Sequence, residues 1–133
     1  MLDERKIAFS VRGEEEQIVL SSVAGFCWWR EALDIARVNH NIWLDIAGWQ
    51  PKLLRRPVGE FYLPIKIMSD TIGASKILFG SDWPAFRLFN GGQKNWVKAF
   101  KESPPTLRES GITFTKEEMD AILGKGASKL LPS

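Results

Sequence analysis

Residues 76–84 read K-I-L-F-G-S-D-W-P, a short apolar run followed by a tight polar turn. The run after the lysine is continuously apolar and ends in glycine, which is typical of a strand buried on both faces of a parallel sheet. The next four residues turn the chain. Asp82 is therefore predicted to lie just beyond the carboxyl end of a buried strand, where parallel α/β proteins gather their functional groups.

Two further strands are predicted before this one. Residues 17–22 and 42–47 are compact apolar runs, and apolar residues at helical spacing over residues 28–38 predict a helix between them. A second helix is expected over residues 64–72, where a glycine ends it. Strands and helices therefore alternate, which predicts an α/β fold with a mostly parallel sheet.

An antiparallel hairpin is predicted at the start of the chain. Residues 6–11 alternate in polarity, and about five residues separate them from the strand at 17–22. A gap of this length suits a hairpin and is too short for the crossover that a parallel pair needs.

The carboxyl-terminal third is predicted to be helical. A helix is expected over residues 95–101, and two prolines follow it. Thr115 with Glu118 three residues later forms a capping-box pattern, which predicts a helix over residues 116–123. A short helix over residues 127–131 is expected after the glycine-rich turn.

Length and composition exclude several classes of protein. The 133 residues are predicted to form one domain, 1–133, and are fewer than the roughly 200 of a complete (β/α)8 barrel. The 18 basic and 16 acidic residues form no basic stripe, which argues against a nucleic-acid partner. No apolar run suits a membrane helix or a signal peptide, and one cysteine fits a reducing compartment. We therefore expect a cytoplasmic protein without a membrane partner.

The residues that follow the predicted strands are the candidates for function. Asp82 can bind a metal, act as a general base or cap the next segment. Ser22, Trp49 and Trp83 fall at strand ends, where they can line a substrate pocket, although tryptophans more often pack in a core or an interface. Asp45 lies on its strand, and we expect it to have a buried, hydrogen-bonded structural role.

Histidine and cysteine each occur once. His40 lies in the turn before the strand at 42–47, at the amino end of the sheet, opposite the candidate residues. Cys27 has no neighbouring base and no cation nearer than Arg30, so we expect an inert thiol in the core. A single chain therefore cannot assemble a zinc site of any standard ligand spacing.

Four segments together resemble a known family. They are I-L-F-G-S-D-W-P (77–84), N-I-W-L-D-I-A-G-W (41–49), W-W-R-E-A-L (28–33) and the tail I-L-G-K-G-A-S-K-L-L (122–131). They are similar to the last βα units of amidohydrolase-superfamily barrels, above all to the group of aminocarboxymuconate semialdehyde decarboxylase and the resorcylate decarboxylases. The resemblance spans roughly residues 17–131. It implies a partial TIM barrel made of the last three βα units.

The resemblance also implies a metal-dependent hydrolase or decarboxylase. Such barrels hold a divalent metal, usually zinc, with histidines on the first, fifth and sixth strands and an aspartate on the eighth. Asp82 matches that aspartate, which contacts the metal or its water and shuttles a proton. Ser22 stands where the sixth-strand histidine is expected, and the first and fifth strands have no counterpart. A metal such as zinc is therefore expected only if a partner supplies ligands.

Part of a barrel leaves strand edges and apolar faces open. One chain supplies four predicted strands including the hairpin, so a homodimer would supply eight; alternatively, a separate polypeptide carries the missing first half. The hairpin favours the homodimer. Two functions stay open. The chain is either the carboxyl-terminal half of a metal-dependent hydrolase or decarboxylase, inactive alone, or a degenerate half-barrel that acts as a small binding or assembly module.

Overall fold

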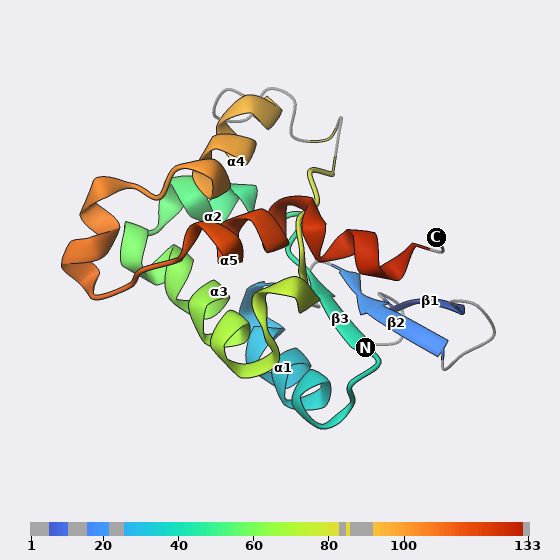
Figure 1. Cartoon of the computed structure of the whole chain (residues 1–133). Helices are drawn as coiled ribbons and strands as arrows, with labels where there is room; N and C mark the ends of the chain where they lie inside the picture. The colour runs from blue at the N-terminus through green and yellow to red at the C-terminus, as the bar shows by residue number, and fades with distance from the viewer. Residues whose placement is uncertain (1–5, 11–15, 22–25, 83–84, 86–91, 132–133) are drawn as a thin grey trace.

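The computed structural model describes residues 6–10, 16–21, 26–82, 85 and 92–131. Four strands form one sheet in the order β1, β2, β3, β4, with helices packed around it (Figure 1). The first pair is antiparallel and the other two pairs are parallel. The strands are β1 Lys6–Ser10, β2 Glu16–Leu20, β3 Ile42–Asp45 and β4 Ile77–Leu78.

The predictions about the sheet are confirmed in their main features. The amino-terminal hairpin pairs β1 with β2, from Lys6 opposite Leu20 to Ser10 opposite Glu16. The strands β2, β3 and β4 then run in parallel, separated by helices, as the alternating pattern predicted. This mixed α/β arrangement is compatible with part of a TIM barrel.

The helices differ widely in length, and within the described residues none is both long and apolar enough to cross a membrane. The α-helices are α1 Trp29–Val38, α2 Gln50–Arg55, α3 Val58–Ile72, α4 Gly92–Lys101 and α5 Lys116–Asp120. Short 3-10 turns and one π-helical turn, η6, connect them: η3 Phe26–Trp28, η4 Ala74–Lys76, η5 Pro105–Ser110, η6 Ala121–Lys125 and η7 Ala127–Leu130.

The main core lies on the face of the sheet that α1 and α3 cover. Leu20, Leu44 and Ile77 of the three parallel strands are buried there. Helix α1 contributes residues at the predicted helical spacing, and α3 contributes its apolar face. The buried residues of these helices are Trp29, Ala32, Leu33 and Ala36 of α1 and Phe61, Tyr62, Ile65 and Met68 of α3.

A second, smaller cluster lies on the opposite face of the sheet. Because side chains alternate along a strand, Val19, Trp43 and Leu78 point away from the main core. Leu130 of η7 packs against them, and each of the four is less than 9% exposed. The chain therefore covers this face with its own carboxyl-terminal turn.

The carboxyl-terminal segment passes around the β4 edge to reach that face. Met119 and Ile122 belong to the main core, whereas Leu130 belongs to the second cluster. Between them, the backbone N–H of Phe79 donates to the carbonyl oxygen of Ile122 at 3.1 Å. This bond satisfies a backbone group at the edge of the sheet that would otherwise be open to another strand.

Most predicted elements have somewhat different bounds in the structure, and two of these differences have a clear physical cause. The strand predicted over 76–80 is shorter, because the chain beyond Leu78 bonds to η6 instead of extending the ladder. The helix predicted to begin at Pro64 begins at Val58, so this proline lies inside α3. A proline removes one backbone hydrogen bond, and burial of the α3 side chains in the main core outweighs that loss.

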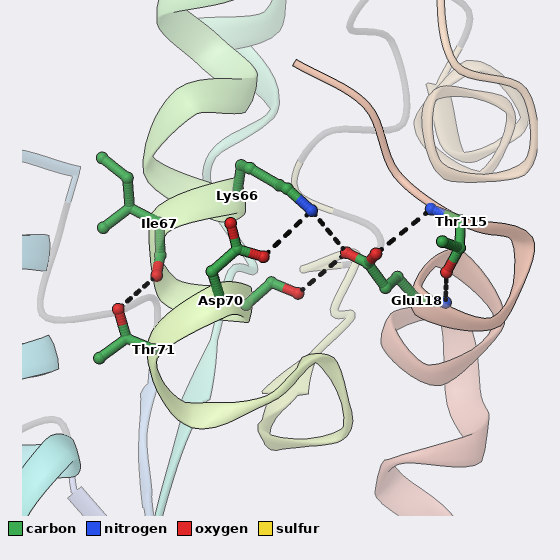
Figure 2. Close-up of polar contacts among 7 residues, drawn as sticks. Lys66, Ile67, Asp70, Thr71, Thr115 and Glu118 are labelled. Atoms are coloured by element: carbon green, nitrogen blue, oxygen red, sulfur yellow. Dashed lines mark hydrogen bonds and ion pairs between the residues drawn. The ribbon is translucent and has the colours of Figure 1, made fainter. Parts of the chain in front are cut away.

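Glu118 ties the carboxyl-terminal segment to α3 (Figure 2). The predicted capping box is confirmed: the Thr115 hydroxyl accepts the Glu118 N–H at 3.1 Å, and the Glu118 carboxylate accepts the Thr115 N–H at 3.4 Å. The same carboxylate pairs with Lys66 at 3.0 Å, and Lys66 also pairs with Asp70 at 3.0 Å. This half-buried network fixes α5 against the main core.

Candidate functional site

Asp45 and Asp82 come together where the parallel strands end. Asp45 is the last residue of β3. Asp82 follows β4, which runs parallel to β3, so both residues lie at the carboxyl ends of the strands. Burial raises the pKa of the Asp45 carboxyl above its usual value; a hydrogen bond from Ala47 opposes this rise, and the negative charge of Asp82 adds to it. The two carboxyl groups are therefore electrostatically coupled.

The Asp45 carboxyl has a defined position. Its Oδ1 accepts the backbone N–H of Ala47 at 2.6 Å, in agreement with the hydrogen-bonded role expected from the sequence. Gly80 lies directly beside it: a Cβ added there would lie 3.0 Å from Oδ1 of Asp45 and 2.7 Å from the Cβ of Ala47. A glycine is therefore required for β3 and the end of β4 to approach this closely.

Asp82 lies in a turn with strained backbone geometry. Its φ is +49°, in the left-handed region that non-glycine residues seldom adopt. Its carbonyl oxygen accepts the N–H of Ala85 at 2.7 Å, which closes the turn. The side chain is exposed, and within the described part of the chain no group donates a hydrogen bond to its carboxylate.

The carbonyl groups just before Asp82 are held by two distant side chains. The Trp96 indole N–H donates to the carbonyl oxygen of Gly80 at 2.7 Å, and the Gln50 amide donates to that of Ser81 at 2.6 Å. Sequence reasoning missed both residues. Gln50 offered no motif, and Trp96 had the spacing of an ordinary core residue.

Of the remaining predicted site residues, Trp49 alone lies in the described part of the chain. Trp49 is 1% exposed within the main core, and its ring meets the Phe26 ring edge-on at 4.6 Å. Ser22 and Trp83, the other predicted pocket residues, lie outside the described residues. The expectation that Cys27 is a core thiol is wrong, because the turn η3 leaves it exposed ahead of α1.

The described residues alone do not form the zinc site that the resemblance implies. Within them, no three His, Cys, Asp or Glu side chains gather where they could hold a metal. His40 is exposed at the amino end of β3, as predicted, far along the strand from the carboxyl-end aspartates. Asp45 and Asp82 offer two carboxylates, whereas a zinc site needs at least three protein ligands.

Three surface hollows lie elsewhere on the described part of the molecule. Two of them, of about 330 and 450 Å³, flank Pro104 and Pro105 after α4. The third, of about 610 Å³, runs along α4 beside Lys94, Lys98 and Lys101. Neither Asp45 nor Asp82 lines any of these three hollows, so none of them forms a pocket around the two aspartates.

The fold is that of an α/β protein with three parallel strands and two carboxylates at their carboxyl ends. A comparison with family models identifies the family. A model of the amidohydrolase family matches residues 18–132. The chain belongs to the amidohydrolase family, which confirms the superfamily resemblance inferred from the four sequence segments. The match begins inside β2, so β1 lies outside it. Searches of curated proteins and of solved structures give no match.

Asp45→Asn is expected to reduce the pH dependence of stability. Because the pKa of Asp45 is raised on folding, the folded chain holds this proton more tightly than the unfolded chain does. The stabilisation from protonated Asp45 is complete below the pKa that this carboxyl has in the unfolded chain. It is lost as pH rises through the pKa that the carboxyl has in the folded chain. Relative to wild type, the asparagine variant should therefore gain stability as pH rises above about 4.

Urea unfolding across that pH range measures this difference. Asp82→Asn is a second test, because it removes the neighbouring negative charge and should lower the pKa of Asp45 and so weaken the pH dependence to a smaller extent. A constant stability difference between Asp45→Asn and wild type at all pH values would contradict the raised pKa.

Proposed function

We propose that the chain is the carboxyl-terminal part of an amidohydrolase-type hydrolase or decarboxylase, inactive on its own, in which Asp82 is the principal functional residue. The observation that carries the proposal is the position of Asp82. It follows the last parallel strand within the family match, and its carboxylate has no hydrogen-bond donor in the described part of the chain.

The partner in this function is a complementary chain that carries the first half of the barrel. The family is generally metal-dependent, and the resemblance assigns most ligands of a metal such as zinc to histidines. Two copies of this chain hold two histidines in total, one each, and His40 lies at the wrong end of the sheet. A homodimer therefore cannot supply these ligands.

The proposed substrates are small carboxylated or cyclic molecules. This proposal rests on the similarity of the segments around Asp45 and Asp82 to the group that includes aminocarboxymuconate semialdehyde decarboxylase. In the completed site, Asp82 would act as a metal ligand and proton shuttle.

Metal analysis tests the proposal. The purified chain alone should contain no stoichiometric zinc or manganese. A complex with a polypeptide that carries the first five βα units of an amidohydrolase barrel should retain metal, and Asp82→Ala should remove it. Stoichiometric metal in the lone chain, or a complex that keeps its metal in Asp82→Ala, would overturn the proposal.

A second function, a non-catalytic binding or assembly module, is favoured by one specific observation. The chain itself covers edges and a face of the parallel sheet that a complete barrel would cover with further elements. β1 pairs with β2, the Ile122 carbonyl bonds to the backbone after β4, and Leu130 covers the face opposite the main core. Within the described residues β1 pairs with β2 alone, so its outer edge can pair with a second copy, and a homodimer is the proposed assembly in this case. Light scattering separates the alternatives, because a dimer at micromolar concentration supports the module, whereas assembly with a complementary half supports the enzyme.

A further inference from the structure

We propose that Gln50 and Trp96 are positioning residues that hold the Asp82 carboxylate at the strand end. This inference rests on the proposed role of Asp82. Its basis is a series of three successive carbonyl groups, each fixed by a hydrogen bond: Trp96 bonds to Gly80, Gln50 to Ser81 and the Ala85 N–H to Asp82.

The buried amide oxygen of Gln50 lowers the stability of the folded chain. Gln50 is 7% exposed, and its Oε1 is buried without a hydrogen-bond partner. An unsatisfied buried acceptor destabilises the folded chain. An apolar side chain of similar length, such as methionine, would avoid that loss of stability at the start of α2. The amide hydrogen bond to Ser81 is the one contact of Gln50 that methionine cannot reproduce.

Trp96 holds the adjacent carbonyl from the other side of the turn. It belongs to α4, which follows the turn in sequence, whereas Gln50 belongs to α2, which precedes it. The indole is 2% exposed, stacks on Phe79 and meets Phe100 edge-on. These ring contacts fix the direction of the indole N–H. The turn is therefore held by two elements that are packed independently into the core.

The strain at Asp82 explains why such support is needed. A non-glycine residue at positive φ is less stable than in the usual backbone conformations, and it persists where surrounding contacts enforce it. The exposed carboxylate has no hydrogen bond to the described residues, so the backbone at Asp82 determines only where its Cα–Cβ bond points, and with it the region that the carboxylate can reach. Without the Gln50 and Trp96 hydrogen bonds, we expect the turn to relax and the carboxylate to move away from Asp45.

Gln50→Met tests this inference, because it removes the hydrogen bond and the unsatisfied acceptor together and so leaves overall stability nearly unchanged. The expected result is at least about tenfold faster hydrogen exchange of the Ala85 amide, together with a change in the amide-to-α-proton coupling of Asp82, which reports φ. The Asp45 carboxyl, followed by carbon-13 NMR, should titrate at lower pH as Asp82 moves away.

Trp96→Phe provides a second, independent variant, because it keeps an aromatic ring in the core while it removes the indole donor together with part of the ring volume. Tyr62→Phe is the matched control: it deletes another buried side-chain donor, the hydroxyl that bonds to the Ala99 carbonyl oxygen at 2.7 Å, away from the turn. The control should leave Ala85 exchange and the Asp45 titration unchanged.

The outcomes separate this inference from the proposed function. If folded Gln50→Met and Trp96→Phe leave Ala85 exchange, the Asp82 coupling and the Asp45 titration as in wild type, the positioning role is overturned. If Tyr62→Phe alters them equally, the effect is global and the role is likewise overturned. All three measurements use the metal-free chain, so a failure of Asp82 to support metal binding in a complex would leave them intact.

Discussion

Gly126→Ala is expected to lower the free energy of unfolding by about 3 kcal/mol, the upper range for overpacking a tight site. The backbone of Gly126 is right-handed and suits any residue, so the effect comes from space alone. An added Cβ would overlap the carbonyl oxygen of Ser75 and lie 2.8 Å from its carbonyl carbon and 2.9 Å from the carbonyl oxygen of Ala121. Backbone atoms cannot move aside as a flexible side chain can.

Gly124→Ala is the matched control for that change. It makes the same substitution two residues earlier, where an added Cβ meets nothing within 4 Å. Urea unfolding of both variants measures the difference. If both variants lose the same stability, the cause is general flexibility of the turn, and the close contact between Gly126 and Ser75 does not determine the path of the carboxyl-terminal segment.

Leu130→Asp is expected to have an effect of similar or larger size. Truncating a buried leucine costs about 2–5 kcal/mol, and burying a carboxylate adds to this. We expect η7 to detach and to expose Val19, Trp43 and Leu78 on the face that it covers. An apolar face of this kind promotes association, so the variant should self-associate at micromolar concentration in light scattering while the parallel sheet persists in circular dichroism.

The adjacent residue offers a control of the same chemistry. Leu131 is 69% exposed, so Leu131→Asp should change neither stability nor oligomeric state. A monomeric Leu130→Asp variant as stable as Leu131→Asp would contradict the role of η7 as a cover.

The features that the sequence predicted well depend on local patterns. The capping box of Thr115 and Glu118 needs two residue types at a fixed spacing, and the structure contains it. The hairpin and the parallel strands follow from apolar runs and the lengths of their connections. The amidohydrolase family was recognisable because four short segments, one of which contains Asp82, occur in a characteristic order along the chain.

The features that the sequence did not predict depend on contacts between distant residues. Pro64 is tolerated inside α3 because the core buries the helix around it. Gln50 and Ser81 lie 31 positions apart, and no local pattern records their hydrogen bond. In the sequence, Cys27 has no neighbouring base or nearby cation, which suggested a core thiol, but η3 leaves it exposed.

The exposure of Cys27 also makes the chain suitable for labelling. As the single cysteine of the sequence, its thiol can receive one fluorophore or spin label without further mutation. The label would lie at the start of α1, the helix that follows β2, and hence toward the carboxyl ends of the parallel strands. Its emission or mobility would report directly when a second polypeptide arrives at that end of the sheet.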